Sequence, residues 1–196
     1  MRKNWAALAL TGMLCLTTFA GTQTVSAETA DSAKQVDIVF THDTHSHLNT
    51  FTTIVDEAEK EVGGFARINT LIQEQKAKNP DTLVIDGGDF SMGTLIQTVF
   101  ETQAAEIRML GYMGCDVTTL GNHEFDYRSK GLANMLNSAA ESGDNLPALV
   151  VCNVDWESME AAGLSEGQQL IRDAFDEYGV SDYVVLEKGD TDIAVV

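Results

Sequence analysis

Four short stretches of this 196-residue chain gather side chains that bind metal ions or transfer protons. They are His42-Asp43-Thr44-His45-Ser46-His47, Asp86-Gly87-Gly88-Asp89, Gly121-Asn122-His123-Glu124-Phe125-Asp126 and Asn153-Val154-Asp155. Carboxylate, imidazole and amide oxygen ligands suit divalent ions of intermediate hardness, such as Mn²⁺, Fe²⁺, Zn²⁺ or Co²⁺. No thiol joins these sets, which argues against a structural zinc site. If the segment is extended, Asp43 and His45 project from the same face.

Each of the four stretches follows a run of residues that is typical of a buried strand. These runs are Val36–Thr41, Thr82–Ile85, Asp116–Leu120 and Ala148–Cys152. In an open α/β sheet the carboxyl ends of the strands line the ligand crevice. We therefore expect the polar side chains to converge on one region, and the glycines before Asp89 to permit close approach of the backbone there.

Between these strands the apolar residues recur at helical spacing. The predicted helices are Gly64–Lys78, Thr94–Tyr112, Ser129–Ser142 and Ser165–Tyr178, with Ser129 as an N-cap. Tyr183–Leu186 and Ile193–Val196 are predicted to form a hairpin through Gly189-Asp190. Unbroken apolar strands of this kind are typical of sheets buried on both faces, so the pattern predicts an α/β fold of layered sheet and helices.

The N-terminus has the pattern of a secretory signal peptide. A short basic start precedes an apolar run at residues 6–20, and Val25-Ser26-Ala27 offers small residues before a cleavage site. The alternative is a membrane anchor, for which the run is short of the ~20 residues that a span requires. We predict a signal peptide at residues 1–27, a flexible leader at 28–35, and a secreted, cell-surface or periplasmic protein without stable membrane insertion after cleavage.

The composition limits the possible partners. The formal net charge is −18, so the surface repels nucleic-acid backbones and attracts divalent cations, and it also favours solubility. Outside the signal peptide there are two cysteines, Cys115 and Cys152. Each lies beside an apolar run, so each could be a buried apolar residue, or the two could form a disulfide in an oxidising compartment.

Three motifs in this order, each after a predicted strand, resemble the calcineurin-like metallophosphoesterase superfamily: Asp43-x-His45, Gly88-Asp89 and Gly121-Asn122-His123-Glu124. The extension Phe125-Asp126 and the stretch Thr41–Leu48 are similar to the secreted bacterial 5′-nucleotidase and 2′,3′-cyclic-nucleotide phosphodiesterase family. The resemblance covers roughly residues 36–196. It implies a site with two divalent metal ions, whose identity (Mn, Zn, Fe, Co or Mg) stays open.

The resemblance also implies a role for each matching residue. Asp43 and His45 would ligate the first metal, Asp89 would bridge both, and Asn122 would ligate the second through its amide oxygen. His123 would remain unligated and contact the phosphoryl group, together with Asn122, as a general acid or transition-state stabiliser. Asp126 would orient His123. A metal-bound hydroxide would attack phosphorus in line.

This sequence also departs from the family pattern. The family has later metal-ligating histidines, including a Gly-His-x-His block, and a nucleoside-binding C-terminal domain. The histidines here are His42, His45, His47 and His123. We therefore expect residues 36–196 to be the N-terminal part of a catalytic domain, truncated before the second half of the fold.

The expected function is metal-dependent hydrolysis of phosphate esters, with nucleotides as the expected substrates. The alternative is an inactive truncated remnant that binds metal or nucleotide weakly. A third idea is another hydrolysis within the superfamily, of sulfur esters or sugar nucleotides. Asp86 and Glu124 are expected to make hydrogen bonds behind the metal ligands, His42 and His47 to be exposed neighbours, and Asn153 could be a site residue or a turn residue.

Overall fold

A parallel sheet of four strands forms the centre of the fold, within residues 35–196 that the computed structural model describes. Its strands are β1 (Ile38–Thr41), β4 (Leu83–Asp86), β5 (Val117–Thr118) and β6 (Ala148–Leu149), in that spatial order. All three neighbouring pairs are parallel. The predicted α/β class is confirmed, although β5 and β6 are shorter than the runs that predicted them.

The predicted signal peptide at residues 1–27 lies outside the described residues, and so does all of the predicted leader except its last residue. Within residues 35–196, no helix is long and apolar enough to cross a membrane.

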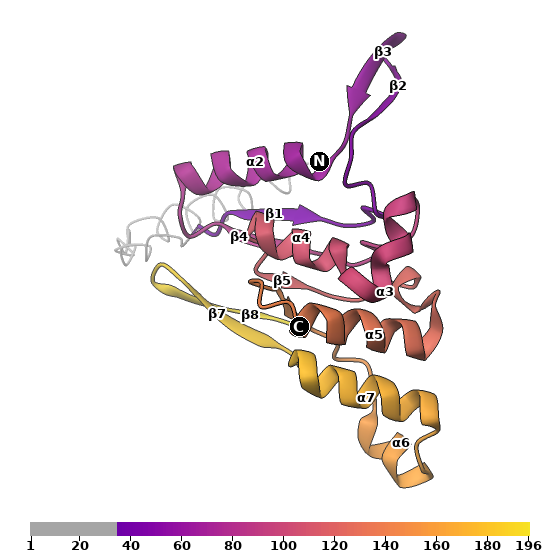
Figure 1. The fold of residues 1–196 in the computed structure, drawn as a ribbon. Helices are drawn as coiled ribbons and strands as arrows, with labels where there is room; N and C mark the ends of the chain where they lie inside the picture. Colours follow the sequence, from indigo (N-terminus) through magenta and orange to yellow (C-terminus); the bar gives the residue numbers. More distant parts are fainter. Residues whose placement is uncertain (1–34) are drawn as a thin grey trace, which may run out of the picture. The chain divides into compact units, whose positions relative to one another are not determined.

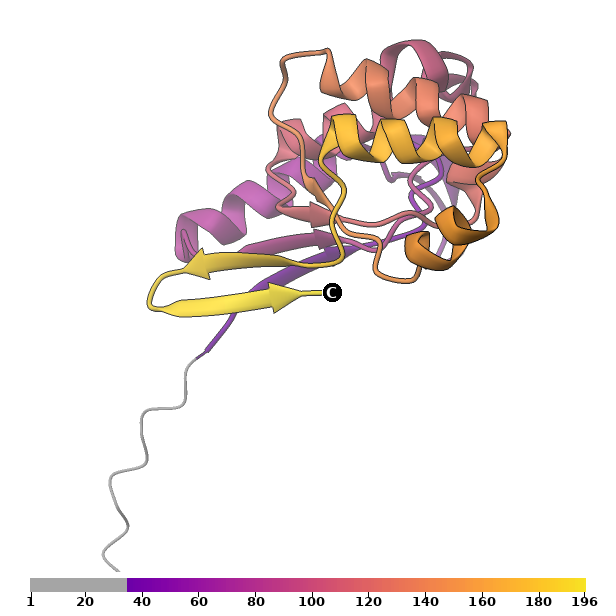
Figure 2. The same ribbon diagram turned by 90° about the horizontal axis from the view of Figure 1, so that it is seen from below.

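The helices that bury the core lie on one side of the sheet (Figure 1, Figure 2). They are α2 (Phe65–Lys78), α4 (Ala105–Met113), α5 (Arg128–Ala140) and α7 (Glu166–Tyr178). Between them and the sheet is a core of fully buried side chains that includes Ile107, Leu132, Leu136 and Leu149. Removal of this apolar surface from water is the main term that holds the helices against the strands.

The helix predicted over Thr94–Tyr112 is wrong as one element. The structure has a 3₁₀ turn η1 (Leu95–Val99), a short helix α3 (Phe100–Gln103) and α4. The break is at Ala104, whose φ of 46° is left-handed. Phe100, Ala104 and Ile107 are all fully buried, so the core holds both sides of the bend. The spacing of apolar residues does not reveal such a break, because the residues on both sides of Ala104 keep the helical spacing.

The helix ends follow the predictions in part. At Ser165 the side chain accepts from the backbone N–H of Gln168 in a capping box, and α4 ends at Gly114, whose φ is 85°. The predicted N-cap at Ser129 is wrong, because α5 already begins at Arg128 and the cap position belongs to Tyr127.

The other described elements are two hairpins, a short helix and the 3₁₀ turn η2 (His123–Phe125). The predicted hairpin is confirmed as β7 (Val184–Lys188) and β8 (Thr191–Val195). The hairpin of β2 (Phe51–Val55) and β3 (Ala58–Val62), which projects from the helical layer in Figure 1, and the helix α6 (Trp156–Ala162) were not predicted. The turn of the β2–β3 hairpin is Asp56-Glu57, both with positive φ, instead of the glycine-containing pair that usually signals such a turn.

Within residues 35–196 no helix covers the opposite face of the sheet (Figure 2). The expected burial on both faces is confirmed for β4, where the successive residues Leu83 and Val84 are both buried, but it is wrong for the edge strand β1. Ile38 and Phe40 of β1 are 55% and 59% exposed there. A hollow of about 580 Å³ lies against this face, lined by Phe40, Ile85 and Val117 of the sheet and by Val195 of β8. Val39 and Val84 pack in the core under the helices, and because successive side chains of a strand point to opposite faces, their neighbours point to the other face of the sheet.

The two cysteines of the described region are both free, so the disulfide considered between them is not formed. Cys115 is buried two residues before β5, and its thiol lies 3.2 Å from the carbonyl oxygen of Val117. Burial raises the pKa of the Cys115 thiol from 9.0 to about 12. Cys152 is exposed.

We predict that an alkylating reagent at mildly alkaline pH labels Cys152 in the native protein and leaves Cys115 unlabelled, because the thiolate is the reactive form and the pKa of Cys115 keeps it protonated. Peptide mass spectrometry after digestion would measure each site separately. Denaturation before labelling is the control, since both cysteines should then react. Equal labelling in the native protein would contradict the burial of Cys115.

Candidate metal centre

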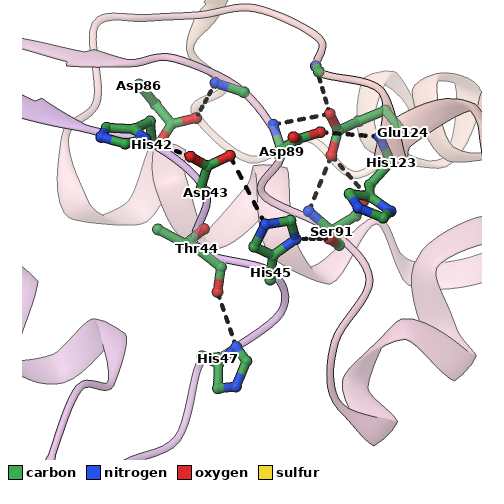
Figure 3. Close-up of polar contacts among 12 residues, drawn as sticks. His42, Asp43, Thr44, His45, His47, Asp86, Asp89, Ser91, His123 and Glu124 are labelled. Atoms are coloured by element: carbon green, nitrogen blue, oxygen red, sulfur yellow. Dashed lines mark hydrogen bonds and ion pairs between the residues drawn. The ribbon is translucent and has the colours of Figure 1, made fainter.

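Three of the four loops that the sequence predicted to converge, those after β1, β4 and β5, meet at the carboxyl edge of the sheet (Figure 3). Backbone hydrogen bonds join the first two loops, since the Asp43 N–H donates to the carbonyl of Gly88 at 3.0 Å and the His45 N–H to that of Asp89 at 3.1 Å. The third loop contacts the second where the His123 N–H donates to Asp89 Oδ1 at 2.9 Å. Side chains up to 80 positions apart in the sequence, from Asp43 to His123, thus share one site.

Asp43, His45 and Asp89 form a group that could hold a metal ion. One ligand atom from each lies within 4.8 Å of the others, and His45 Nε2 is 3.8 Å from Asp43 Oδ1. The other ring nitrogen of His45 lies 3.3 Å from the carbonyl oxygen of Ser91. A carbonyl can only accept, so this contact places the proton on Nδ1 and leaves the lone pair of Nε2 facing the two carboxylates.

The backbone brings these side chains together in a different way from the one expected. Asp43, His45 and Asp89 have φ of 52°, 44° and 52°, so the segment is a succession of left-handed turns instead of an extended strand. Such residues each cost on the order of 1–3 kcal/mol and persist where the surroundings fix them. The expectation that Asp43 and His45 face the same region is confirmed, but its stated reason is wrong.

Glycine allows the close approach of the second and third loops, as predicted. Gly88 has φ of 84°, and a Cβ there would lie 2.7 Å from the backbone nitrogen of Gly121. A Cβ at Gly121 would in turn fall on the carboxylate of Asp89. Any side chain at these two positions would therefore push Asp89 away from the third loop.

The amide of Asn122 also faces the group. Its outer atom lies 3.2 Å from Asp89 Oδ2, and the amide can be turned either way at this position. With nitrogen outward it donates to the carboxylate; with oxygen outward two acceptors face each other, which is favourable only with a cation between them. The predicted role of Asn122 as an oxygen ligand thus fits the geometry of one of its two orientations.

His123 and Asp126 form a pair beside the group. Nδ1 of His123 is 2.8 Å from Asp126 Oδ2, and the ring packs edge-on against His45 with centroids 5.0 Å apart. The hydrogen bond to Asp126 raises the pKa of His123, which favours the imidazolium. A hydrogen bond from His42 lowers the pKa of Asp43, which keeps that carboxyl ionised.

Two buried carboxylates hold the loops from behind, as expected for Asp86 and Glu124. Glu124 accepts from the N–H groups of Asp89, Ser91 and Gly121 and from the Ser91 hydroxyl at 2.7 to 3.0 Å. Asp86 accepts from Thr41, Gly88 and Thr118, and its burial raises its pKa.

The remaining polar residues lie at the margin. His42 is exposed and bonded to Asp43, with Nδ1 2.6 Å from Oδ2. Nδ1 of His47 lies 3.2 Å from the Thr44 carbonyl oxygen, and its ring packs on Phe51. Asn153 lines the hollow on the open face of the sheet. Sequence reasoning did not single out Ser91 or Glu106. A signal for Glu106 exists, because it is a charged residue on the same helical face as Leu110 and Met113.

Residues 36–192 match the family model described as calcineurin-like phosphoesterase, which is most of the chain. The chain belongs to the calcineurin-like phosphoesterase family. The resemblance stated from the motifs is therefore confirmed, and the three loops that carry Asp43, Asp89 and His123 all lie within the matched residues.

Members related to 5′-nucleotidases are among the relatives of this calcineurin-like phosphoesterase. A probable 5′-nucleotidase of Treponema pallidum is 34% identical over 107 residues, which are 53% of this chain and 18% of that protein. The NAD 5′-nucleotidase of Haemophilus influenzae is 31% identical over 114 residues, which are 56% of this chain and 19% of that protein. The crystal structure of a 5′-nucleotidase precursor from Thermus thermophilus matches with a TM-score of 0.60 and 27% identity, over 81% of this chain and 27% of that one. The chain thus spans a fifth to a quarter of the length of these relatives and matches the N-terminal part of the fold.

The donor set fits a divalent ion, so we predict that the purified protein binds Mn²⁺ and that Asp89→Asn weakens this binding by at least about tenfold, since it removes the charge of a central ligand. Titration followed by the electron paramagnetic resonance signal of free Mn²⁺ would measure it. Asp173→Asn is the matched control, because Asp173 is an acidic residue of α7 outside the site. Equal weakening in both variants would indicate diffuse attraction to an acidic surface.

Proposed function

We propose that this protein takes part in metal-dependent hydrolysis of phosphate esters, with nucleotides as substrates. The observation that carries the proposal is the convergence of Asp43, His45 and Asp89 with the His123–Asp126 pair at one edge of the sheet. Metal ligands alone would fit a structural site. A half-exposed imidazole that is oriented by a carboxylate, and is not itself one of the ligands, is instead suited to act on a bound molecule.

In this proposal Asp43, His45 and Asp89 would hold one divalent ion, and Asp89 and Asn122 would hold a second. When bound, such ions supply an activated water for attack on phosphorus and compensate the negative charge of the phosphoryl oxygens. Asp89 Oδ1 accepts a hydrogen bond from the His123 N–H. Asp89 would therefore ligate the metal ions and also hold the loop that carries His123.

His123 is the proposed catalytic residue of the chain. Its Nδ1 proton is held by Asp126, so Nε2 is the atom available to a phosphoryl oxygen or to the leaving group. The raised pKa favours the protonated ring, which can donate to developing negative charge as a general acid or by hydrogen bonding. Nucleotide substrates are proposed because relatives carry the names 5′-nucleotidase and NAD 5′-nucleotidase.

A second candidate function is binding of metal or nucleotide without turnover. One observation favours it: within residues 35–196, Asp43, His45 and Asp89 are the one group of three acidic, His or Cys residues placed to hold an ion. The second ion would have only Asp89 and Asn122 from the described part of the chain.

Hydrolysis of p-nitrophenyl phosphate, AMP, NAD and 2′,3′-cyclic AMP by the purified protein with Mn²⁺ would separate the two functions. For a hydrolase we expect metal-dependent turnover that falls by about 10²–10⁴-fold in His123→Ala, since general acid catalysis contributes that much. His47→Ala is the matched control, because His47 is held by Thr44 at the margin of the site. Metal and AMP binding without turnover would support the second candidate, and unchanged turnover in His123→Ala would contradict the role of His123.

We also propose that the protein is exported through residues 1–27 and acts as a secreted, cell-surface or periplasmic protein without membrane insertion. The basic, apolar and small-residue order of that segment supports the proposal. Mass spectrometry of the exported protein should find an N-terminus at Glu28. An N-terminus at Met1 in a membrane fraction would instead indicate an uncleaved anchor.

A further inference from the structure

The segment that carries Asp43 and His45 has a contact with the helical layer that the metal site does not explain. Ser46, the residue after His45, is fully buried, and its hydroxyl donates to Oε1 of Glu106 at 2.7 Å. Glu106 is in the first turn of α4, 60 residues away along the chain, and is also fully buried.

Burial of a carboxylate at this position costs free energy. Glu106 lies among the core residues that α4 contributes, such as Leu110 and Met113, and burial raises its pKa. Its second oxygen, Oε2, has no hydrogen-bond partner within the described residues. Buried ionisable groups generally stabilise a fold less than apolar residues of the same volume would. Stability of the core is therefore a poor reason for glutamate here, and the contact with Ser46 is a better one.

The segment needs such a contact because its backbone is strained. Ser46 has φ of 55° and follows His45 at 44°, two consecutive non-glycine residues in the left-handed region. This conformation persists only where several contacts fix it. The Ser46 N–H donates to the Phe90 carbonyl at 2.8 Å, and the Ser46 carbonyl accepts from the Thr94 hydroxyl at 2.6 Å.

These backbone contacts all come from the loop that follows β4, which itself carries Asp89. They join the first loop to the second, which is itself held by Glu124 and by Phe90 of the core. The bond from Ser46 to Glu106 is a direct link between the first loop and the helical layer, because α4 is packed into the core through Ile107, Leu110 and Met113. It ties the segment to an element whose position the core determines.

We propose that Glu106 is a positioning residue of the metal centre, which holds the left-handed turn at His45-Ser46 through the Ser46 hydroxyl and so fixes where Asp43 and His45 present their ligand atoms. The inference deepens the proposed function and rests on it, because positioning serves catalysis only if the centre binds metal.

Two measurements on the purified protein test this role: amide hydrogen exchange by NMR and affinity for Mn²⁺ alone. Glu106→Leu removes the acceptor, Ser46→Ala removes the donor and leaves the helix intact, and Glu106→Gln keeps an acceptor oxygen while removing the charge. Tyr178→Phe is the control, since it deletes a half-buried hydroxyl that donates to the backbone carbonyl of Pro147, away from the site.

Residues that orient ligands typically change metal affinity by 10–100-fold, so we expect Glu106→Leu and Ser46→Ala to weaken Mn²⁺ binding by about tenfold or more. The His45 and Ser46 amides should exchange faster in both variants, while the Val84 amide in the central sheet keeps its wild-type rate. Glu106→Gln should stay within about threefold of the wild type in affinity, because the tether remains. Tyr178→Phe should leave both measurements unchanged.

Wild-type exchange at His45 and Ser46 in both Glu106→Leu and Ser46→Ala would overturn the inference. The inference would also be overturned if the Val84 amide exchanged faster in Glu106→Leu and Ser46→Ala and if Tyr178→Phe had the same effect, because Glu106 would then only stabilise the fold. Absence of Mn²⁺ binding by the wild type is a separate result. It would contradict the proposed function, and the exchange rates alone would then decide whether Glu106 positions the segment.

Discussion

The carboxylate of Glu124 receives four hydrogen bonds, and the geometry of the candidate metal centre depends on them. Three come from the backbone N–H groups of Asp89, Ser91 and Gly121, and the fourth from the Ser91 hydroxyl. Asp89 and Gly121 belong to loops after different strands, so one buried side chain sets the distance between them. The carbonyl of Ser91 accepts a hydrogen bond from His45, so Glu124 also helps to position the first loop through Ser91. A buried charge that satisfies this many donors is stabilised by them, and removing it would leave several N–H groups without a partner.

Two more buried carboxylates accept hydrogen bonds from the same loops. Asp86 holds the turn at Gly88, and Glu106 holds Ser46. Together with Asp43 and Asp89 they concentrate carboxyl groups at one edge of a protein that is already strongly acidic. Such a cluster repels itself in a medium of low dielectric, and a divalent cation relieves the repulsion. The same cations that would serve the chemistry would thus also stabilise the loops that bind them.

The sequence predicted the part of this protein that depends on strand order. Each ligand-bearing stretch follows an apolar run, and parallel strands necessarily bring such stretches to one edge, so the convergence of Asp43, Asp89 and His123 could be stated before the structure. The turn at Ala104 and the hairpin turn at Asp56-Glu57 could not be predicted, because both place non-glycine residues at positive φ that only the surrounding packing enforces. The left-handed geometry of Asp43 and His45 was missed for the same reason. Glu106 was missed because a contact 60 residues distant leaves no local pattern beyond one charge in an apolar stripe.

The site residues all lie between Asp43 and Asp126, on the loops after three adjacent strands, β1, β4 and β5. The register of those strands, with Thr41 opposite Asp86 and Ile85 opposite Val117, decides which residues emerge together at the edge. A shift of one position would turn the last side chain of each strand to the other face, so Asp86 would no longer meet both Thr41 and Thr118. Those two hydroxyls belong to the flanking strands and bond to opposite oxygens of the same carboxylate, at 2.7 and 3.1 Å. Asp86 can make both bonds only in the observed register, which is the register that brings the three loops together. This accounts for a buried acid in the central strand of the three. The geometry of the candidate metal centre then follows from the sheet, and the β2–β3 hairpin, α6 and the β7–β8 hairpin supply none of its proposed ligands.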